Sequence, residues 1–218
     1  MYFFLLIIIP LVYCVSEFIC RGRKPERERI AGVFFGVVLA CIYALIHFFA
    51  IGSFRVWTYS LSAVWLHYFF TEIAIPVVIC LTAVFIGKDS FRIKLSNLFP
   101  VVASFYVVFL PYKLITETIA PDVFCMILYP LLIASMLFNI DTVTFVFEDG
   151  AELEKRLWLR CVISFFAIVP GLLLPPLFRS LYCLKSTGTA TYILAVLYVL
   201  FSAGLRTLAM LFLTEKTV

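Results

Sequence analysis

Glu72 is the residue of this sequence whose type and position are best suited to chemistry. It lies in the middle of a long apolar segment, residues 62–87, with Pro76 four residues later. A carboxylate at the centre of a bilayer costs several kcal/mol unless it is protonated, paired or hydrated, so ionisable residues at that depth are functional by default. Because proline lacks an N–H, the Glu72 carbonyl also loses its helical donor. The kink predicts a cation or proton site; the structural alternative is a protonated Glu72 hydrogen-bonded to Tyr68 or to a neighbouring helix.

The two histidines of the chain, His47 and His67, fall near the facing ends of neighbouring apolar segments. In a helical hairpin both would lie at a similar depth, and we group them with Glu72 as a candidate ion, proton or substrate site. Zinc sites take three or four protein ligands, and no third ligand is evident. We therefore expect no metal and no other cofactor; the competing interpretation is histidines that hydrogen-bond Thr71 or a backbone carbonyl.

Four further charged residues inside apolar segments form two candidate ion pairs. Lys113 and Glu117 are one helical turn apart, which suits an ion pair, although we favour extension of the side chains toward the membrane surface. Asp141 and Arg206 lie at similar depths in different segments, and we expect them to pair across the bundle. Alternatively the segment that holds Asp141 ends near Ile140, and the carboxylate is already in water.

The elements that must position these residues are predicted to be membrane-spanning helices. Hydrophobic residues make up 64% of the 218 residues and charged residues 14%, against roughly 45–50% and about 25% in soluble domains. About 20 apolar residues cross the hydrocarbon core. The sequence therefore predicts an all-α, polytopic integral membrane bundle of about seven transmembrane helices in a single domain, 1–218. The predicted spans are 2–20, 30–54, 62–87, 98–119, 122–147, 158–178 and 190–213.

The distribution of Lys and Arg predicts the orientation. With the N-terminus outside, twelve basic residues fall on the inner side, and only Arg55, Arg179 and Lys185 fall outside. Short basic loops stay in the cytoplasm, so we expect an external N-terminus and a cytoplasmic C-terminus, in the cytoplasmic membrane of a bacterium. Spans two to four and five to seven then have opposite orientations, as in the inverted repeats of many transporters, without residue-level similarity between the halves.

Small residues recur every four positions in the second span, at Gly32, Gly36, Ala40 and Ala44. This spacing lets two helix backbones approach closely in lipid, so it predicts a packing seam. His47 falls on the same face and should point toward protein.

Transport is the function that these features favour: we expect a small-solute or ion transporter, or the membrane subunit of one. The alternative is a non-catalytic subunit or assembly factor of a larger membrane complex. An intramembrane enzyme ranks third, because HExxH, Walker A and GxSxG motifs are absent from the sequence. The expected partners are the lipid bilayer and other membrane subunits, not nucleic acid. A water-filled cavity at Glu72 would favour transport, and a dry core with a lipid-facing apolar groove would favour the subunit.

Overall fold

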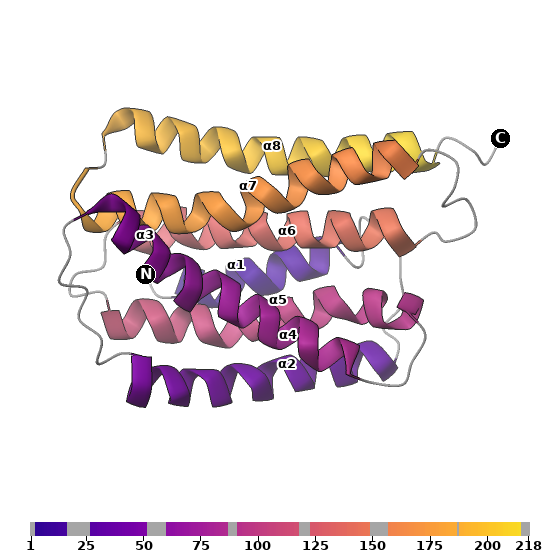
Figure 1. Ribbon diagram of the computed structural model, residues 1–218, viewed down its shortest axis with the longest axis horizontal. Helices are drawn as coiled ribbons and strands as arrows, with labels where there is room; N and C mark the ends of the chain where they lie inside the picture. The colour runs from indigo at the N-terminus through magenta and orange to yellow at the C-terminus, as the bar shows by residue number, and fades with distance from the viewer. Residues whose placement is uncertain are drawn as a thin grey trace.

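Helices lie side by side along one axis in the computed structural model, which describes residues 3–16, 27–51, 60–86, 91–117, 123–148, 157–186 and 188–214 (Figure 1). Within these ranges all regular secondary structure is helical. The α-helices are α1 (Phe3–Cys14), α2 (Arg27–Ile46), α3 (Leu61–Tyr68), α4 (Ile75–Phe85), α5 (Phe91–Glu117), α6 (Tyr129–Glu148), α7 (Leu157–Cys183) and α8 (Thr189–Thr214). π-helical turns join or extend them, among them η2 (His47–Ile51), η3 (Phe69–Ala74) and η4 (Phe124–Leu128).

Six helical stretches of the described residues are long and apolar enough to cross a membrane. They are Arg29–Ala50, Leu61–Phe85, Lys94–Thr116, Phe124–Phe147, Leu157–Cys183 and Thr189–Leu211. The prediction of a helical membrane bundle is confirmed at this level. The first predicted span, 2–20, is described only over residues 3–16, where α1 has 12 residues. A seventh span and the orientation of the termini stay predictions.

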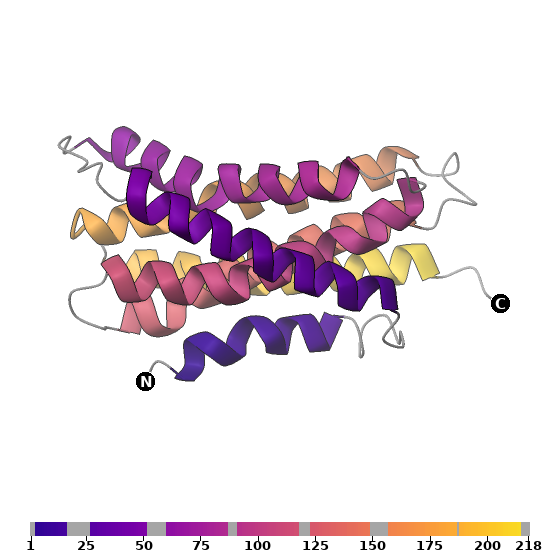
Figure 2. The ribbon, with the colours of Figure 1, turned by 90° about the horizontal axis from the view of Figure 1, so that it is seen from below.

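Two helices, α5 and α6, form the centre of the bundle. In the most apolar 18-residue segment of each of these two spans, 78% of the residues are buried, against 22–39% in the corresponding segments of the other four spans. Figure 1 shows α2 and α8 at opposite edges of the bundle, and Figure 2 shows α1 and the α3–α4 stretch on opposite sides of it. A polar residue on α5 or α6 therefore faces protein, whereas the outer helices expose rows of large apolar side chains that suit lipid.

The backbones of α2 and α5 approach each other closely at Gly36. A Cβ atom built on Gly36 would lie 2.0 Å from Ser104 Oγ and 2.3 Å from the carbonyl oxygen of Val101. Ala40, one turn later, is fully buried, and His47 is 2% exposed. The predicted seam is confirmed, and His47 faces protein as expected.

The ends of the bundle differ in the sequence of their connections. We call the end at which α2, α5 and α7 finish the low-charge end, and the opposite end, which receives the Lys- and Arg-rich connections, the basic end. Two arginines counted above among the basic residues on the two sides of the membrane belong to α7 and are buried: Arg160 is 4% exposed and Arg179 is 3% exposed. Arg160 lies within the predicted segment 158–178. Arg179 was predicted to lie just beyond that segment and is buried because α7 continues to Cys183.

Candidate functional site: a buried charged cluster

The backbone around Glu72 leaves the α-helical hydrogen-bonding pattern. In η3 the N–H of Ile75 bonds to the carbonyl of Phe70, five residues back rather than four. The next residue, Pro76, has no N–H. The carbonyls of Thr71 and Glu72 thus lose the donors that a regular α-helix would provide.

Two tyrosine hydroxyls from other helices take the place of those donors. Tyr43 of α2 donates to the carbonyl of Thr71 at 2.7 Å, and Tyr106 of α5 donates to the carbonyl of Glu72 at 2.6 Å. A buried carbonyl without a donor would cost about 1–3 kcal/mol. The Glu72 carbonyl lacks its helical donor, as inferred from the sequence, but it accepts a hydrogen bond from the Tyr106 hydroxyl.

The Glu72 side chain is 2% exposed and contacts groups from two other helices. The Tyr129 hydroxyl donates to its Oε2 atom. Lys113 Nζ lies 3.8 Å from Oε1 and 2.7 Å from Nε2 of His47. A protonated lysine can only donate, so the His47 contact uses Nε2 as an acceptor. His47, Lys113, Glu72 and Tyr129 form a continuous polar chain through the bundle.

Arg179 of α7 adds a second cation to this cluster. Its guanidinium lies 5.3 Å from the ring centroid of Tyr129 and 5.5 Å from that of Tyr68, within the range of cation–π attraction. It donates to Cys125 Sγ at 3.2 Å and interacts electrostatically with Glu72. Because α7 continues to Cys183, it places the Arg179 guanidinium beside Glu72. The sequence had placed this charge outside the membrane.

His67 occupies a different position from the other residues predicted for this site. Its side chain is half-buried, and its ring centroid lies 5.4 Å from that of Tyr68. Its backbone carbonyl accepts a hydrogen bond from Thr71 Oγ1 at 2.7 Å. Among the described residues no group of three or more His, Cys, Asp and Glu side chains could hold a metal ion.

The expected neighbour of Lys113 was Glu117, whose side chain lies outside the described part of the structure. Lys113 itself is 1% exposed. Its extension toward the membrane surface, which we favoured, is therefore wrong: the ammonium turns inward because Glu72 and His47 provide partners there.

A second charged cluster lies nearer the basic end. Arg206 Nη2 is 3.0 Å from Asp141 Oδ2, and the two residues are 1% and 0% exposed. The hydroxyl of Ser16 also donates to Asp141 Oδ2, and the Arg206 guanidinium lies 4.2 Å from the ring centroid of Phe145. The alternative in which Asp141 is in water is wrong, because α6 continues to Glu148.

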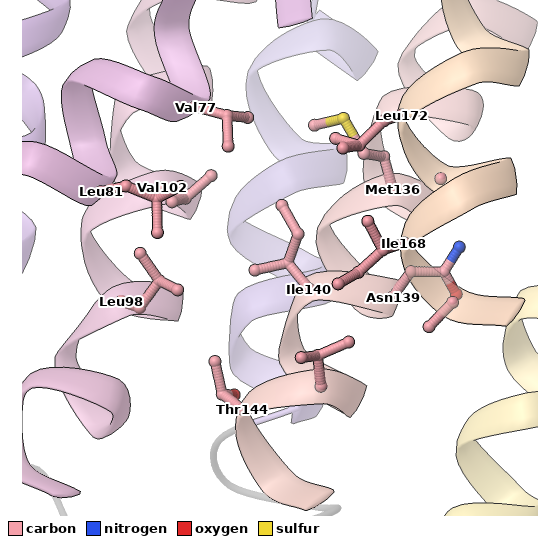
Figure 3. Close-up of a pocket in the computed structure, with 13 residues that line it drawn as sticks. Val77, Leu81, Leu98, Val102, Met136, Asn139, Ile140, Thr144, Ile168 and Leu172 are labelled. Atoms are coloured by element: carbon pink, nitrogen blue, oxygen red, sulfur yellow. The ribbon is translucent and has the colours of Figure 1, made fainter. Parts of the chain in front are cut away.

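Glu72 does not line either of two cavities formed by the described residues. One, of about 140 Å³, lies among α4, α5, α6 and α7 and is lined only by apolar atoms. Figure 3 shows the side chains of α4 and α5 on one side of it and those of α6 and α7 on the other. The other cavity, of about 220 Å³, lies among α1, α2 and α5.

Comparison with protein families, with curated proteins and with solved structures finds no match to this chain. Function is therefore inferred from the geometry of the site.

Four partners of the site were missed by the sequence reasoning: Tyr43, Tyr106, Tyr129 and Arg179. Eleven tyrosines occur in the chain, so their residue type alone does not distinguish these. The position of Tyr129 directly before Pro130 is a weak signal, and the lack of acidic residues near Arg179 in α7 could have suggested a partner on another helix.

The cluster is suited to holding and moving a proton or to binding a small ion. In a low-dielectric interior, charge interactions are much stronger than in water. A proton on Glu72 would weaken its attraction to Lys113, and the Lys113–His47 contact provides a second pair of groups between which a proton can be shared.

Proposed function

We propose that this membrane protein transports a proton, a small ion or a small solute, alone or as the membrane subunit of a transporter, and that the cluster around Glu72 is its binding site. The observation that supports this most is the burial of Glu72 with Lys113, His47 and Arg179 inside membrane-spanning helices. Charges so deep in a bilayer are expensive, and they mark ion pathways and proton relays.

The backbone of η3 supports the same proposal. π-helical turns inside α-helices occur frequently at functional sites, and broken helices near the bilayer centre often carry the site in transporters. Here two tyrosines from α2 and α5 hold the carbonyls of Thr71 and Glu72. A change in the charge of Glu72 would act on a segment whose geometry depends on neighbouring helices.

The second candidate is a non-catalytic subunit or assembly factor of a larger membrane complex. It is favoured by the exclusion of Glu72 from both described cavities and by the apolar cavity among α4 to α7. In that function the cluster would only hold the helices together.

The decisive experiment needs no known substrate. The thermal unfolding midpoint of the purified wild type is measured across pH and with several monovalent and divalent cations, beside Glu72→Gln and Glu72→Asp. For a coupling site, the wild-type midpoint responds to pH or to one cation, Glu72→Gln does not respond, and Glu72→Asp responds in part.

Asp141→Asn is the matched control, since it neutralises another buried carboxylate that has a cation and a hydroxyl as partners. Its midpoint should be lower than that of the wild type, because Arg206 loses its partner, but it should shift with pH and cations as the wild type does. If wild type and Glu72→Gln respond equally under every condition, transport through this site is refuted and the structural subunit is left.

A further inference from the structure

We propose that the crevice between α4 and α7 binds an acyl chain of an anionic phospholipid, whose headgroup is held by Lys94. The site is separate from the Glu72 cluster and does not depend on the transport proposal.

The crevice arises because the α3–α4 stretch changes its packing partner along its length. α3 and η3 pack against α7, whereas α4 packs against α5. In Figure 1 the α4 ribbon crosses toward the edge of the bundle that holds α2, while the α7 ribbon runs toward the opposite edge. The two outer helices therefore diverge toward the basic end, and α5 and α6 form the floor between them.

The walls of the crevice fit hydrocarbon and exclude water. Val102 and Met136 on its floor are fully buried, whereas Ile168 on its rim is 40% exposed. Only apolar atoms line the cavity of about 140 Å³. An apolar cavity of comparable size stays dry in a soluble protein and accepts apolar ligands. In a membrane the solvent around the crevice consists of lipid acyl chains, and such a chain can enter the crevice past Ile168.

The polar residues at the border of the crevice bond to groups elsewhere in the bundle. The amide nitrogen of Asn139 donates to Ser202 Oγ of α8 at 3.1 Å, and the hydroxyl of Thr144 donates to the carbonyl of Asp141 at 2.8 Å. Asn139 Oδ1 has no hydrogen-bond partner among the described residues, but it is buried, and no polar atom of the lining exposes surface to the crevice.

Lys94 supplies a positive charge at the end of the crevice where the membrane span of α5 begins. It is one helical turn from Leu98, which lines the cavity, so both project from the same face of α5. Lys94 Nζ donates to the carbonyl of Phe85 at 2.9 Å, at the end of α4. An ammonium has three N–H donors, so a lipid phosphate can bind it while the acyl chain runs past Leu98.

A neighbouring helix is a poorer occupant than an acyl chain. Packed helices keep their axes about 8–10 Å apart, so a helix backbone cannot reach Met136 on the floor. The excess of Lys and Arg in the basic-end connections also favours an anionic lipid over a neutral one.

The test measures lipid bound to the purified full-length chain by native mass spectrometry, with phosphatidylglycerol and phosphatidylcholine as probes. The wild type should retain phosphatidylglycerol in preference to phosphatidylcholine. Ile168→Trp, which blocks the rim, should abolish retention of both. Lys94→Gln should reduce the preference for phosphatidylglycerol about fivefold, the effect of roughly one interfacial lysine, and keep the chain-binding crevice.

Two matched controls separate the crevice from the general lipid surface. Leu197→Trp adds the same bulk on α8, where Leu197 is 53% exposed, and Lys185→Gln removes an exposed charge at the low-charge end. Both should behave as wild type. If Ile168→Trp retains phosphatidylglycerol as wild type does, or if it instead dissociates a dimer, the lipid assignment is overturned.

Discussion

Both described carboxylates of the bundle interior share one arrangement: a basic side chain from one helix and a hydroxyl from another. Glu72 has Lys113 and Tyr129, and Asp141 has Arg206 and Ser16. The two ion pairs differ in length, 3.8 Å at Glu72 against 3.0 Å at Asp141. The longer contact at Glu72 is the weaker ion pair, so Glu72 is freer to exchange its partner. This is one reason why we propose a functional role for Glu72 and a structural role for Asp141.

Removing one partner of the Asp141–Arg206 pair should lower the free energy of unfolding more than removing both partners. Asp141→Asn or Arg206→Gln alone leaves a charge in a low-dielectric interior, and the loss should be about 3–5 kcal/mol of unfolding free energy. The double variant Asp141→Asn/Arg206→Gln leaves no lone charge and should recover part of this loss. A denaturation titration in detergent measures all four proteins; a double variant no more stable than the singles would contradict the pair.

The sequence predicts the depth of a charged residue better than it predicts its partner. The lengths of the apolar segments placed Glu72, Asp141 and Arg206 inside the membrane, and all three are buried. For Lys113 the nearest acidic residue along the helix suggested Glu117, whereas the ammonium contacts Glu72 and His47. Hydrophobic periodicity fixes which face of a helix is polar but not which helix packs against that face.

At the scale of helices, small residues and proline affect helix packing differently. Small residues let two backbones approach closely, whereas proline leaves backbone carbonyls that need donors from other helices. The Gly36 seam brings α2 and α5 together by close contact of their backbones, since dispersion contacts suffice in lipid. The Ser104 hydroxyl at the seam donates to carbonyls of its own helix. Pro76 instead frees carbonyls that only side chains from other helices can satisfy. The seam was predictable from its four-residue spacing, whereas the choice of α5 as its partner was not.

Replacing Gly36 should destabilise the bundle in proportion to side-chain size. A Cβ at Gly36 would meet Ser104 Oγ and the backbone of Val101 at 2.0 and 2.3 Å, so Gly36→Ala should cost about 1–3 kcal/mol of unfolding free energy and Gly36→Leu should block folding. The control is Gly204→Ala on α8, where an added Cβ meets no atom within 4 Å. That change should be neutral or slightly stabilising. A Gly36→Leu protein with wild-type thermal stability would refute the seam.

At the scale of the whole molecule, each half of the bundle holds one charged cluster. The Glu72 cluster lies toward the low-charge end and the Asp141 cluster toward the basic end, with the apolar crevice between α4 and α7 closer to the latter. The class of the fold follows from segment length, because lipid requires every span to satisfy its own backbone, and six of the seven predicted segments contain long apolar helices. The relative positions of helices do not follow, since lipid-facing and protein-facing apolar surfaces look alike in sequence.

Labelling from each side of the membrane should settle both the orientation and the seventh span. The uneven distribution of Lys and Arg predicts that the low-charge end faces outward. Ser186→Cys, in the exposed residues after α7, should react with a membrane-impermeant maleimide in intact cells, and Lys155→Cys should react only after permeabilisation. The background keeps the buried Cys80 and Cys125 and replaces Cys14, Cys20, Cys41, Cys161 and Cys183 with alanine.

The same background then tests whether segment 2–20 crosses the bilayer. Ser16, near the end of the described part of that segment, bonds to the buried Asp141, so this part of the segment reaches the interior of the bundle. If it continues across, a cysteine placed before Met1 is labelled in intact cells and Lys24→Cys is not. If both react from the same side, α1 enters and returns, the bundle has six complete spans, and the prediction of seven is wrong.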